Sequence, residues 1–230
     1  MNAGAFVERL RDGADAGRAA QEKRYMKSSR PHWGLSAPKI DAAIKTLRPL
    51  PERERLDIAR ALWREEVYDL RIAAARLVAR LPATLDAEIW RFVTERMSDL
   101  DGWAVADNFA DAAGPRLIAV PARLDEVELW TANPHLWTRR ASLVFTLDWM
   151  RAGLPPERML GWAARLVADR EWFIQKAIGW WLRELGKRDP ARVRAWLDAH
   201  GGALKAFARR EAEKYLASPP RKPKRAAAQL

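Results

Sequence analysis

Helical periodicity runs through almost the whole chain, whereas the two-residue alternation that is typical of half-buried strands is missing. Apolar residues recur at spacings of three and four, and prolines and glycines interrupt this pattern at intervals. The predicted helices cover residues 3–11, 15–27, 37–47, 52–64, 69–80, 85–97, 103–112, 124–131, 136–152, 156–167, 170–186, 190–199 and 203–216. A chain with this pattern is restricted to all-α architectures.

The spacing of the helix breakers predicts short helices in antiparallel pairs, at roughly 30–40 residues per pair. No strict sequence repeat is visible, so the pairs would form a degenerate solenoid. We therefore expect a superhelical array in which each pair stacks on its neighbours and the array offers one concave face. A compact helical bundle is the alternative fold.

The charge balance points to a polyanionic partner. The chain has 41 Lys and Arg against 30 Asp and Glu, a formal charge of +11 with a pI near 10.4. Lysine and arginine that contact phosphates release condensed counterions, and this release favours binding to nucleic acid. We therefore expect the concave face to be basic, although a coding bias toward arginine and alanine would also raise the pI.

Several classes of protein are disfavoured by the composition. Cysteine is absent, which excludes disulfides, cysteine-ligated zinc and thiol nucleophiles. His32, His135 and His200 lie far apart and have no metal-ligand spacing, so we expect no metal site. The chain also lacks a long uncharged apolar stretch and a secretion signal. We expect a soluble, cytoplasmic protein that does not associate with membranes.

The domain organisation is predicted to be simple. Residues 1–217 would form one helical-repeat domain, and residues 218–230 would form a disordered tail without an apolar face. The tail carries four basic residues, which would either add phosphate affinity or only improve solubility.

Trp103 and Asp107 form the first constellation that could carry chemistry. Their spacing of four places the ring and the carboxylate on one helix face, one turn apart. Both the face of an indole ring and a carboxylate attract positive charge, so together they suit a cationic substrate or transition state. A core tryptophan beside a solvated aspartate would have the same spacing.

Two further segments combine polar or aromatic residues with a helical pattern. In the first, Arg139 and Arg140 point about 100° apart, so both could face solvent, or one could bind phosphate while the other makes a structural ion pair. In the second, Gly179 lies inside a helix, which suggests that a neighbouring helix or DNA approaches its backbone closely. Trp180 and Trp181 follow it, and only one of two consecutive tryptophans can enter the core.

With these segments the chain resembles the AlkD-type DNA alkylation-repair glycosylases, a family of HEAT-like repeats. The resemblance extends from about residue 20 to 217. The segments that carry it are FIQKAIGWWLRE (173–184), WTRRASLVF (137–145), RYMK (24–27) and ARREAEKYL (208–216). It implies an array of antiparallel HEAT-like helix pairs that excises positively charged N3- and N7-alkylated purines from double-stranded DNA. The family is thought to do this without moving the base into a tight pocket, unlike most glycosylases.

The resemblance also implies roles for residues of this chain. Trp103, Asp107 and Trp180 match the catalytic residues of the family. The family commonly has a W-W-D-x-V-D run, of which residues 102–107 keep only the second tryptophan and the last aspartate. Some relatives have a glutamine where Ser36 falls. These departures concern the substrate range more than the reaction.

The DNA-binding residues follow from the same segments. Arg140 matches an active-site arginine, with Arg139 as the alternative register, and Tyr25 matches a DNA-contacting tyrosine beside Lys27. The resemblance implies a monofunctional glycosylase that acts in base excision repair. We expect it to be a monomer that needs neither cofactor nor metal. The alternative function is a non-catalytic helical scaffold that binds DNA or a protein.

Overall fold

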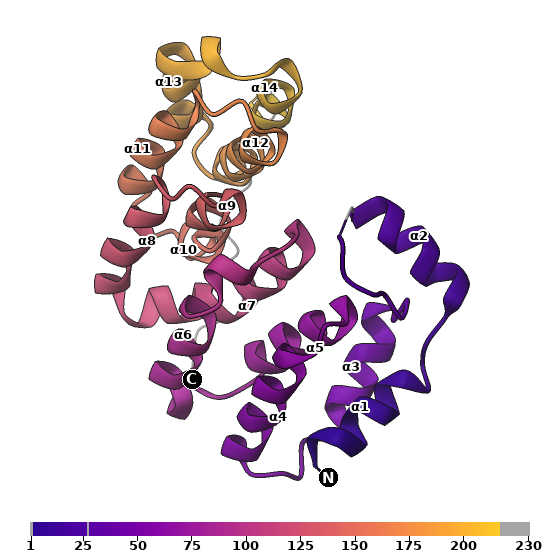
Figure 1. The fold of residues 1–230 in the computed structure, drawn as a ribbon. Helices are drawn as coiled ribbons and strands as arrows, with labels where there is room; N and C mark the ends of the chain where they lie inside the picture. The colour runs from indigo at the N-terminus through magenta and orange to yellow at the C-terminus, as the bar shows by residue number, and fades with distance from the viewer. Residues whose placement is uncertain (1, 27, 217–230) are drawn as a thin grey trace. The chain divides into compact units, whose positions relative to one another are not determined.

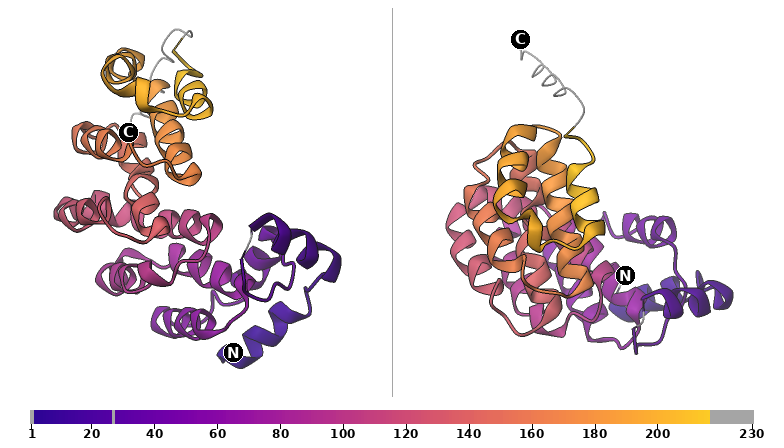
Figure 2. Two further views of the ribbon diagram at one scale, coloured as in Figure 1. Left: turned by 45° about the horizontal axis from the view of Figure 1, so that its top comes forward. Right: turned by 90° about the horizontal axis from the view of Figure 1, so that it is seen from above.

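The secondary structure is helical, as predicted, in the computed structural model, which describes residues 2–26 and 28–216. Helices hold 73% of the described residues, and none of these residues forms a strand. The α-helices are α1 (Ala3–Arg11), α2 (Ala16–Met26), α3 (Ala37–Lys45), α4 (Glu52–Arg64), α5 (Tyr68–Ala79), α6 (Asp86–Thr94), α7 (Trp103–Ala119), α8 (Leu124–Trp130), α9 (Leu136–Val144), α10 (Leu147–Arg151), α11 (Glu157–Leu166), α12 (Trp172–Gly186), α13 (Pro190–His200) and α14 (Ala206–Glu213). Short 3-10 helices η1 (Ala83–Leu85), η2 (Met97–Asp99), η3 (Pro121–Arg123) and η4 (Gly201–Ala203) lie between them. Figures 1 and 2 show these helices and their connections.

The chain divides into two compact units, Met1–Ala141 and Ser142–Leu230, with the division inside α9. The prediction of one domain over residues 1–217 stays a prediction, and the tail at 218–230 lies outside the described residues. In the first unit, α5 packs between α3 and α7, so these three helices form one layer. Helix α4 packs on α5, and α6 packs on α7, as a second layer. Helix α1 packs against α3 and α4.

Side-chain contacts reveal the length of the structural repeat. Arg76 bonds to Asp41, and Arg123 to Asp86, at separations of 35 and 37 residues. In the second unit, the indole of Trp196 donates to the carbonyl of Leu160 at a separation of 36 residues. Each contact therefore joins equivalent positions of successive helix pairs, within the predicted period.

In the second unit, α12 is the central helix. It packs against α10, α11, α13 and α14. Its interior Gly179 faces the backbone of α14: a Cβ atom there would lie 2.6 Å from the carbonyl oxygen of Ala208. The predicted close approach at Gly179 is therefore made by a neighbouring helix.

Two predicted helix boundaries were wrong. The helix expected over residues 136–152 is broken into α9 and α10 around Thr146, whose hydroxyl donates to the carbonyl of Leu143. Such local side-chain bonds compete with the backbone bonds of a helix. The helix predicted over residues 103–112 does not end there, because α7 continues through Pro115 to Ala119. Proline removes one helical hydrogen bond, and the buried packing of α7 compensates for that loss.

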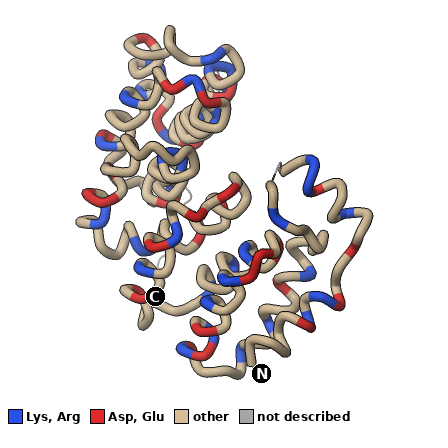
Figure 3. The backbone as a smooth tube through the Cα atoms, in the orientation of Figure 1, with Lys and Arg blue, Asp and Glu red and all other residues tan. Residues whose placement is uncertain are grey.

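Seven of the twelve tryptophans are buried and belong to the core. Figure 3 shows lysine and arginine interspersed with aspartate and glutamate along the helices of each unit. The predicted concave basic face stays a prediction. None of the described helices combines the length and the apolar character that a membrane crossing requires.

Candidate active site

The first turns of α7 hold two of the predicted catalytic residues. Trp103 is the first residue of the helix, and Asp107 follows one turn later; both are partly exposed. Gly102 precedes them, and a Cβ atom there would lie 2.8 Å from the hydroxyl oxygen of Tyr68. The absence of a side chain at Gly102 therefore lets α7 start directly against α5. Trp103 and Asp107 both lie in α7 at a spacing of four residues, which is the helical arrangement that the prediction of a shared face requires.

Asp107 forms an ion pair with Arg140 of α9. The Nη2 atom of Arg140 lies 3.0 Å from Oδ1 and 3.2 Å from Oδ2 of Asp107. The Arg140 side chain is only 2% exposed, whereas that of Asp107 is 21% exposed. Arg140 therefore holds the carboxylate of Asp107 from the interior of the protein, while part of the Asp107 side chain is exposed to solvent. This burial favours a role for Arg140 in fixing Asp107 over direct contact with a phosphate.

The neighbouring Arg139 has different partners. Its Nη1 atom donates to the carbonyl oxygens of Asn133 and Pro134, at 2.8 and 2.7 Å. These bonds hold the turn before α9. Of the two arginines, Arg140 is therefore the one that meets the carboxylate of Asp107, and the prediction that either binds DNA stays untested.

Tyr25 lies next to Trp103. The two ring centroids are 6.0 Å apart and the ring planes meet at 89°, which is an edge-to-face contact. Tyr25 is 70% exposed, so the rest of its ring is available to a ligand. Lys27, which was also predicted to bind DNA, lies outside the described residues.

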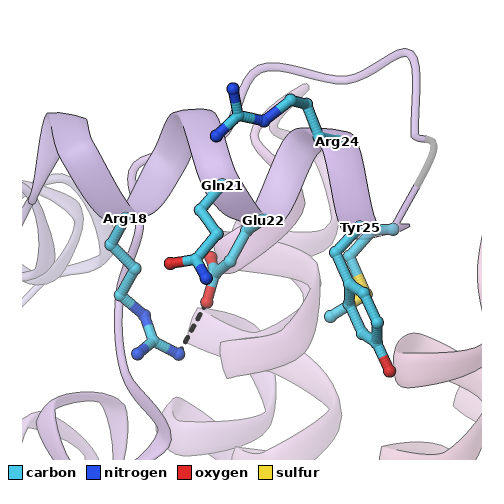
Figure 4. A pocket seen from close by; sticks show the side chains of 6 residues that line it. Arg18, Gln21, Glu22, Arg24 and Tyr25 are labelled. Atoms are coloured by element: carbon cyan, nitrogen blue, oxygen red, sulfur yellow. Dashed lines mark ion pairs between the residues drawn. The ribbon is translucent and has the colours of Figure 1, made fainter.

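A cavity of about 550 Å³ lies along α2. Figure 4 shows Arg18, Glu22 and Tyr25 directed to one side of this helix, whereas Arg24 points to the other. Arg18 pairs with Glu22 at 2.6 Å. No residue of α2 is buried, so this helix presents both its cations and its aromatic ring to approaching molecules.

The segment between α2 and α3 is anchored to the residues just before α7. The hydroxyl of Ser28 donates to Asp101 at 3.1 Å, and Arg30 pairs with the same carboxylate at 2.7 Å. Arg30 also pairs with Asp99 and Glu66. These contacts join the chain after Tyr25 to the chain before Trp103, and the spacing of the residues in the sequence does not predict them. The acidic run before Gly102 was the only signal for them.

Glu22, His32 and Asp69 each offer a potential metal-ligand atom within 4.8 Å of the other two. Their sequence positions gave no sign of this proximity. The carboxylate of Asp69 already accepts hydrogen bonds from the backbone N–H groups of Trp33 and Leu35, at 2.8 and 2.6 Å. Burial lowers the pKa of His32, which favours its neutral ring. Of the three residues, Asp69 therefore anchors the segment after α2.

Trp180 belongs to α12 in the second unit. It is partly exposed, whereas Trp181 is 1% exposed and donates from its indole nitrogen to the hydroxyl of Thr146 at 3.1 Å. The prediction that only one of the two tryptophans enters the core is confirmed. The prediction that Trp180 shares a site with Trp103 and Asp107 stays a prediction.

The comparisons with known proteins concern the family and the fold of the chain. A family model described as DNA alkylation repair enzyme matches residues 6–216. None of the curated proteins matches the chain in sequence.

Three solved structures are similar to the chain. A predicted DNA alkylation repair enzyme from Enterococcus faecalis has a TM-score of 0.74 and 22% identity, over 90% of this chain and 98% of that one. AlkD2 from Streptococcus mutans has a TM-score of 0.61 and 19% identity, over 95% and 99% of the two chains. The protein smu.31 from Streptococcus mutans UA159 has a TM-score of 0.57 and 20% identity, over 79% and 91%. At these identities the likeness concerns the fold alone.

Proposed function

Because the chain belongs to the DNA alkylation repair enzyme family, we propose that it is a monofunctional DNA glycosylase. Its substrates are cationic purines alkylated at N7 or N3 in duplex DNA, such as 7-methylguanine and 3-methyladenine. Their removal begins base excision repair. The names of two structural relatives, a predicted DNA alkylation repair enzyme and AlkD2, support alkylated DNA as the substrate. The observation that carries the proposal is the accessible carboxylate of Asp107, one turn from Trp103 and fixed by Arg140.

The chemistry follows from the charge of the substrate. An alkylated purine is already cationic, so it leaves with the electron pair of the glycosidic bond without first being protonated. The deoxyribose then gains oxocarbenium character, as in glycoside hydrolysis. Asp107 would stabilise this positive charge and accept a hydrogen bond from the water that attacks C1′. The products are the neutral base, an abasic site and one proton released from the water.

Aromatic rings complete the proposed site. Trp103 would place the negative face of its indole against the cationic sugar, with Trp180 as a second ring. The edge-to-face contact with Tyr25 restricts the ring of Trp103 on one side. No lysine nucleophile takes part, so the abasic strand is not cleaved.

The decisive experiment compares Asp107→Asn with wild type. We expect release of 7-methylguanine and 3-methyladenine from methylated duplex DNA, under single-turnover conditions, to fall by about 10²–10³-fold. Affinity for the DNA should hold or increase, because a carboxylate repels phosphates. Asp111→Asn is the matched control, since this exposed carboxylate lies one turn further along α7. Equal rates in wild type and Asp107→Asn would remove Asp107 from the mechanism.

The alternative function is a non-catalytic scaffold that binds DNA or a protein partner. It requires no carboxylate at position 107, and the absence of base release by wild type would favour it. Both functions predict that DNA affinity depends on salt. If about 6–10 phosphates are neutralised, affinity should fall at least about a thousandfold between about 50 and 200 mM salt.

A double-mutant cycle tests whether Arg140 acts by holding Asp107. Removing one partner of a fully buried ion pair leaves an uncompensated charge and costs about 3–5 kcal/mol, and the cost here should be smaller because Asp107 is 21% exposed. Arg140→Gln should therefore destabilise the protein more alone than together with Asp107→Asn, as measured by urea unfolding. If the two changes are additive, the ion pair does not position the carboxylate.

A further inference from the structure

A second cavity of the first unit is lined mainly by cations. It measures about 320 Å³ and lies where the C-terminal ends of α3 and α5 meet α4. Its lining residues are Ile44, Lys45, Arg48, Arg55, Leu77 and Arg80. Four of these six are cationic and none is acidic. We call it the basic cavity. Because its like charges repel each other, an anion that enters the basic cavity stabilises it.

The cations of the basic cavity are mostly available to a ligand. Neither Arg48 nor Arg55 forms an ion pair with a carboxylate in the described part of the chain. The Nε atom of Arg55 is shielded from solvent and has no hydrogen-bond partner among the described residues. An unpaired donor buried beside other cations is costly, and a bound oxyanion would satisfy it.

Arg80 connects the basic cavity to the candidate active site. Its Nη2 atom donates to Asp41 at 2.7 Å, and Asp41 also accepts two hydrogen bonds from Arg76. Arg76 in turn donates to Asn108 at 2.8 Å, and Asn108 follows Asp107 in α7. A continuous chain of polar contacts therefore runs across the layer of α3, α5 and α7, from the basic cavity to the helix that carries Asp107.

The length of α5 sets the spacing of the two sites. Tyr68, which contacts the start of α7, begins this helix, and Arg80 directly follows its end. Twelve residues of helix span about 18 Å. That is the length of about five base pairs of duplex DNA.

We propose that the basic cavity is a binding site for phosphate oxyanions, and that it holds a backbone phosphodiester about five base pairs from the damaged base. Guanidinium groups suit this ligand because their paired N–H donors match phosphate oxygens. The phosphate site follows from the cavity alone, whereas its occupation by damaged DNA rests on the proposed function. A small phosphate compound has the same chemistry as a backbone phosphate, so the test separates these two sources.

The test compares the double variant Arg48→Gln/Arg55→Gln with Arg9→Gln/Arg91→Gln. The control removes the same charge from exposed positions on α1 and α6. In the first arm, pyrophosphate should raise the thermal unfolding midpoint of wild type and control but not of the cavity variant. In the second arm, binding to undamaged duplex is measured against salt, and the slope of the cavity variant should be smaller than that of the control by about 0.9 for each lost phosphate contact.

The combined results identify the ligand. Loss of the pyrophosphate effect together with a smaller slope supports the backbone phosphodiester. Loss of the pyrophosphate effect alone supports the site, with a small phosphate compound as its ligand. Equal behaviour of the two variants in both arms overturns the proposal. Undamaged DNA makes these outcomes independent of base release, and the single variant Arg48→Gln, at an exposed position, repeats the test if the double variant does not fold.

Discussion

Replacing Gly179 by alanine tests how closely α12 and α14 pack. A Cβ atom at this position would lie 2.6 Å from the carbonyl oxygen of Ala208 and 3.1 Å from its Cα atom. Both are backbone atoms, so α14 must move to make room. Over-packing of this kind costs about 1–3 kcal/mol, whereas the higher helix propensity of alanine returns about 1 kcal/mol. We therefore expect Gly179→Ala to lower the free energy of unfolding by up to about 2 kcal/mol.

Gly161 provides the matched control within the same unit. It lies inside α11, and a Cβ atom there would meet nothing within 4 Å. Gly161→Ala should therefore stabilise the protein by up to about 1 kcal/mol, through helix propensity alone. Urea unfolding, followed by far-ultraviolet circular dichroism, measures both variants. The two free energies should differ by about 1–3 kcal/mol, which is the over-packing contribution. Equal stabilisation by both substitutions would refute the close approach of α12 and α14.

Two further predictions concern ionisation and burial. The hydrogen bond from Arg76 lowers the pKa of Asp41 below its ordinary value of 3.8. The ionised Asp41 therefore contributes its full stabilisation of the fold above pH 3.8, and this stabilisation is lost as the pH falls through the lowered pKa. Asp41→Asn should therefore reduce the free energy of unfolding at neutral pH more than at about pH 2, and a pH-independent difference would contradict this assignment. Trp181→Phe should cost about 1–3 kcal/mol, because it opens a gap in the core and removes the hydrogen bond to Thr146. Trp180→Phe, at a partly exposed position, should cost less in the same unfolding measurement.

Local patterns in the sequence were sufficient to predict the helices and some of their special positions. Periodicity predicted the helices because most of them bury a stripe of apolar side chains, although no residue of α2 is buried. The interior glycine at position 179 indicated a close approach, and the adjacent tryptophans indicated one buried ring. The break at Thr146 was missed because it depends on a side-chain hydrogen bond within an apolar run, without proline or glycine. Continuation of α7 through Pro115 was missed because packing outweighed a local rule.

The site was only partly predictable because its contacts join successive helix pairs. Trp103 and Asp107 share a helix turn, so their spacing alone identified them as candidates. The partner of Asp107 could not be chosen from spacing, since Arg139 and Arg140 lie 32 and 33 residues away with similar patterns. The basic cavity was also invisible, because Arg48 and Arg55 come together only when α4 packs against the layer of α3 and α5.

The ion pair with Arg140 determines what kind of substrate suits Asp107. A carboxylate balanced by a buried guanidinium repels DNA phosphates less than an isolated one, so the duplex can approach it. The carboxylate of Asp107 is held by two bonds from Arg140 and is partly exposed, so a second cation can approach it from solvent. Because its position is fixed beforehand, the carboxylate does not have to reorganise when that cation develops. A carboxylate engaged with arginine is poorly suited to donate a proton or to stabilise an anion, however, and an uncharged lesion such as uracil would need one or the other to leave. In the proposed mechanism the site is therefore matched to bases whose positive charge is already present.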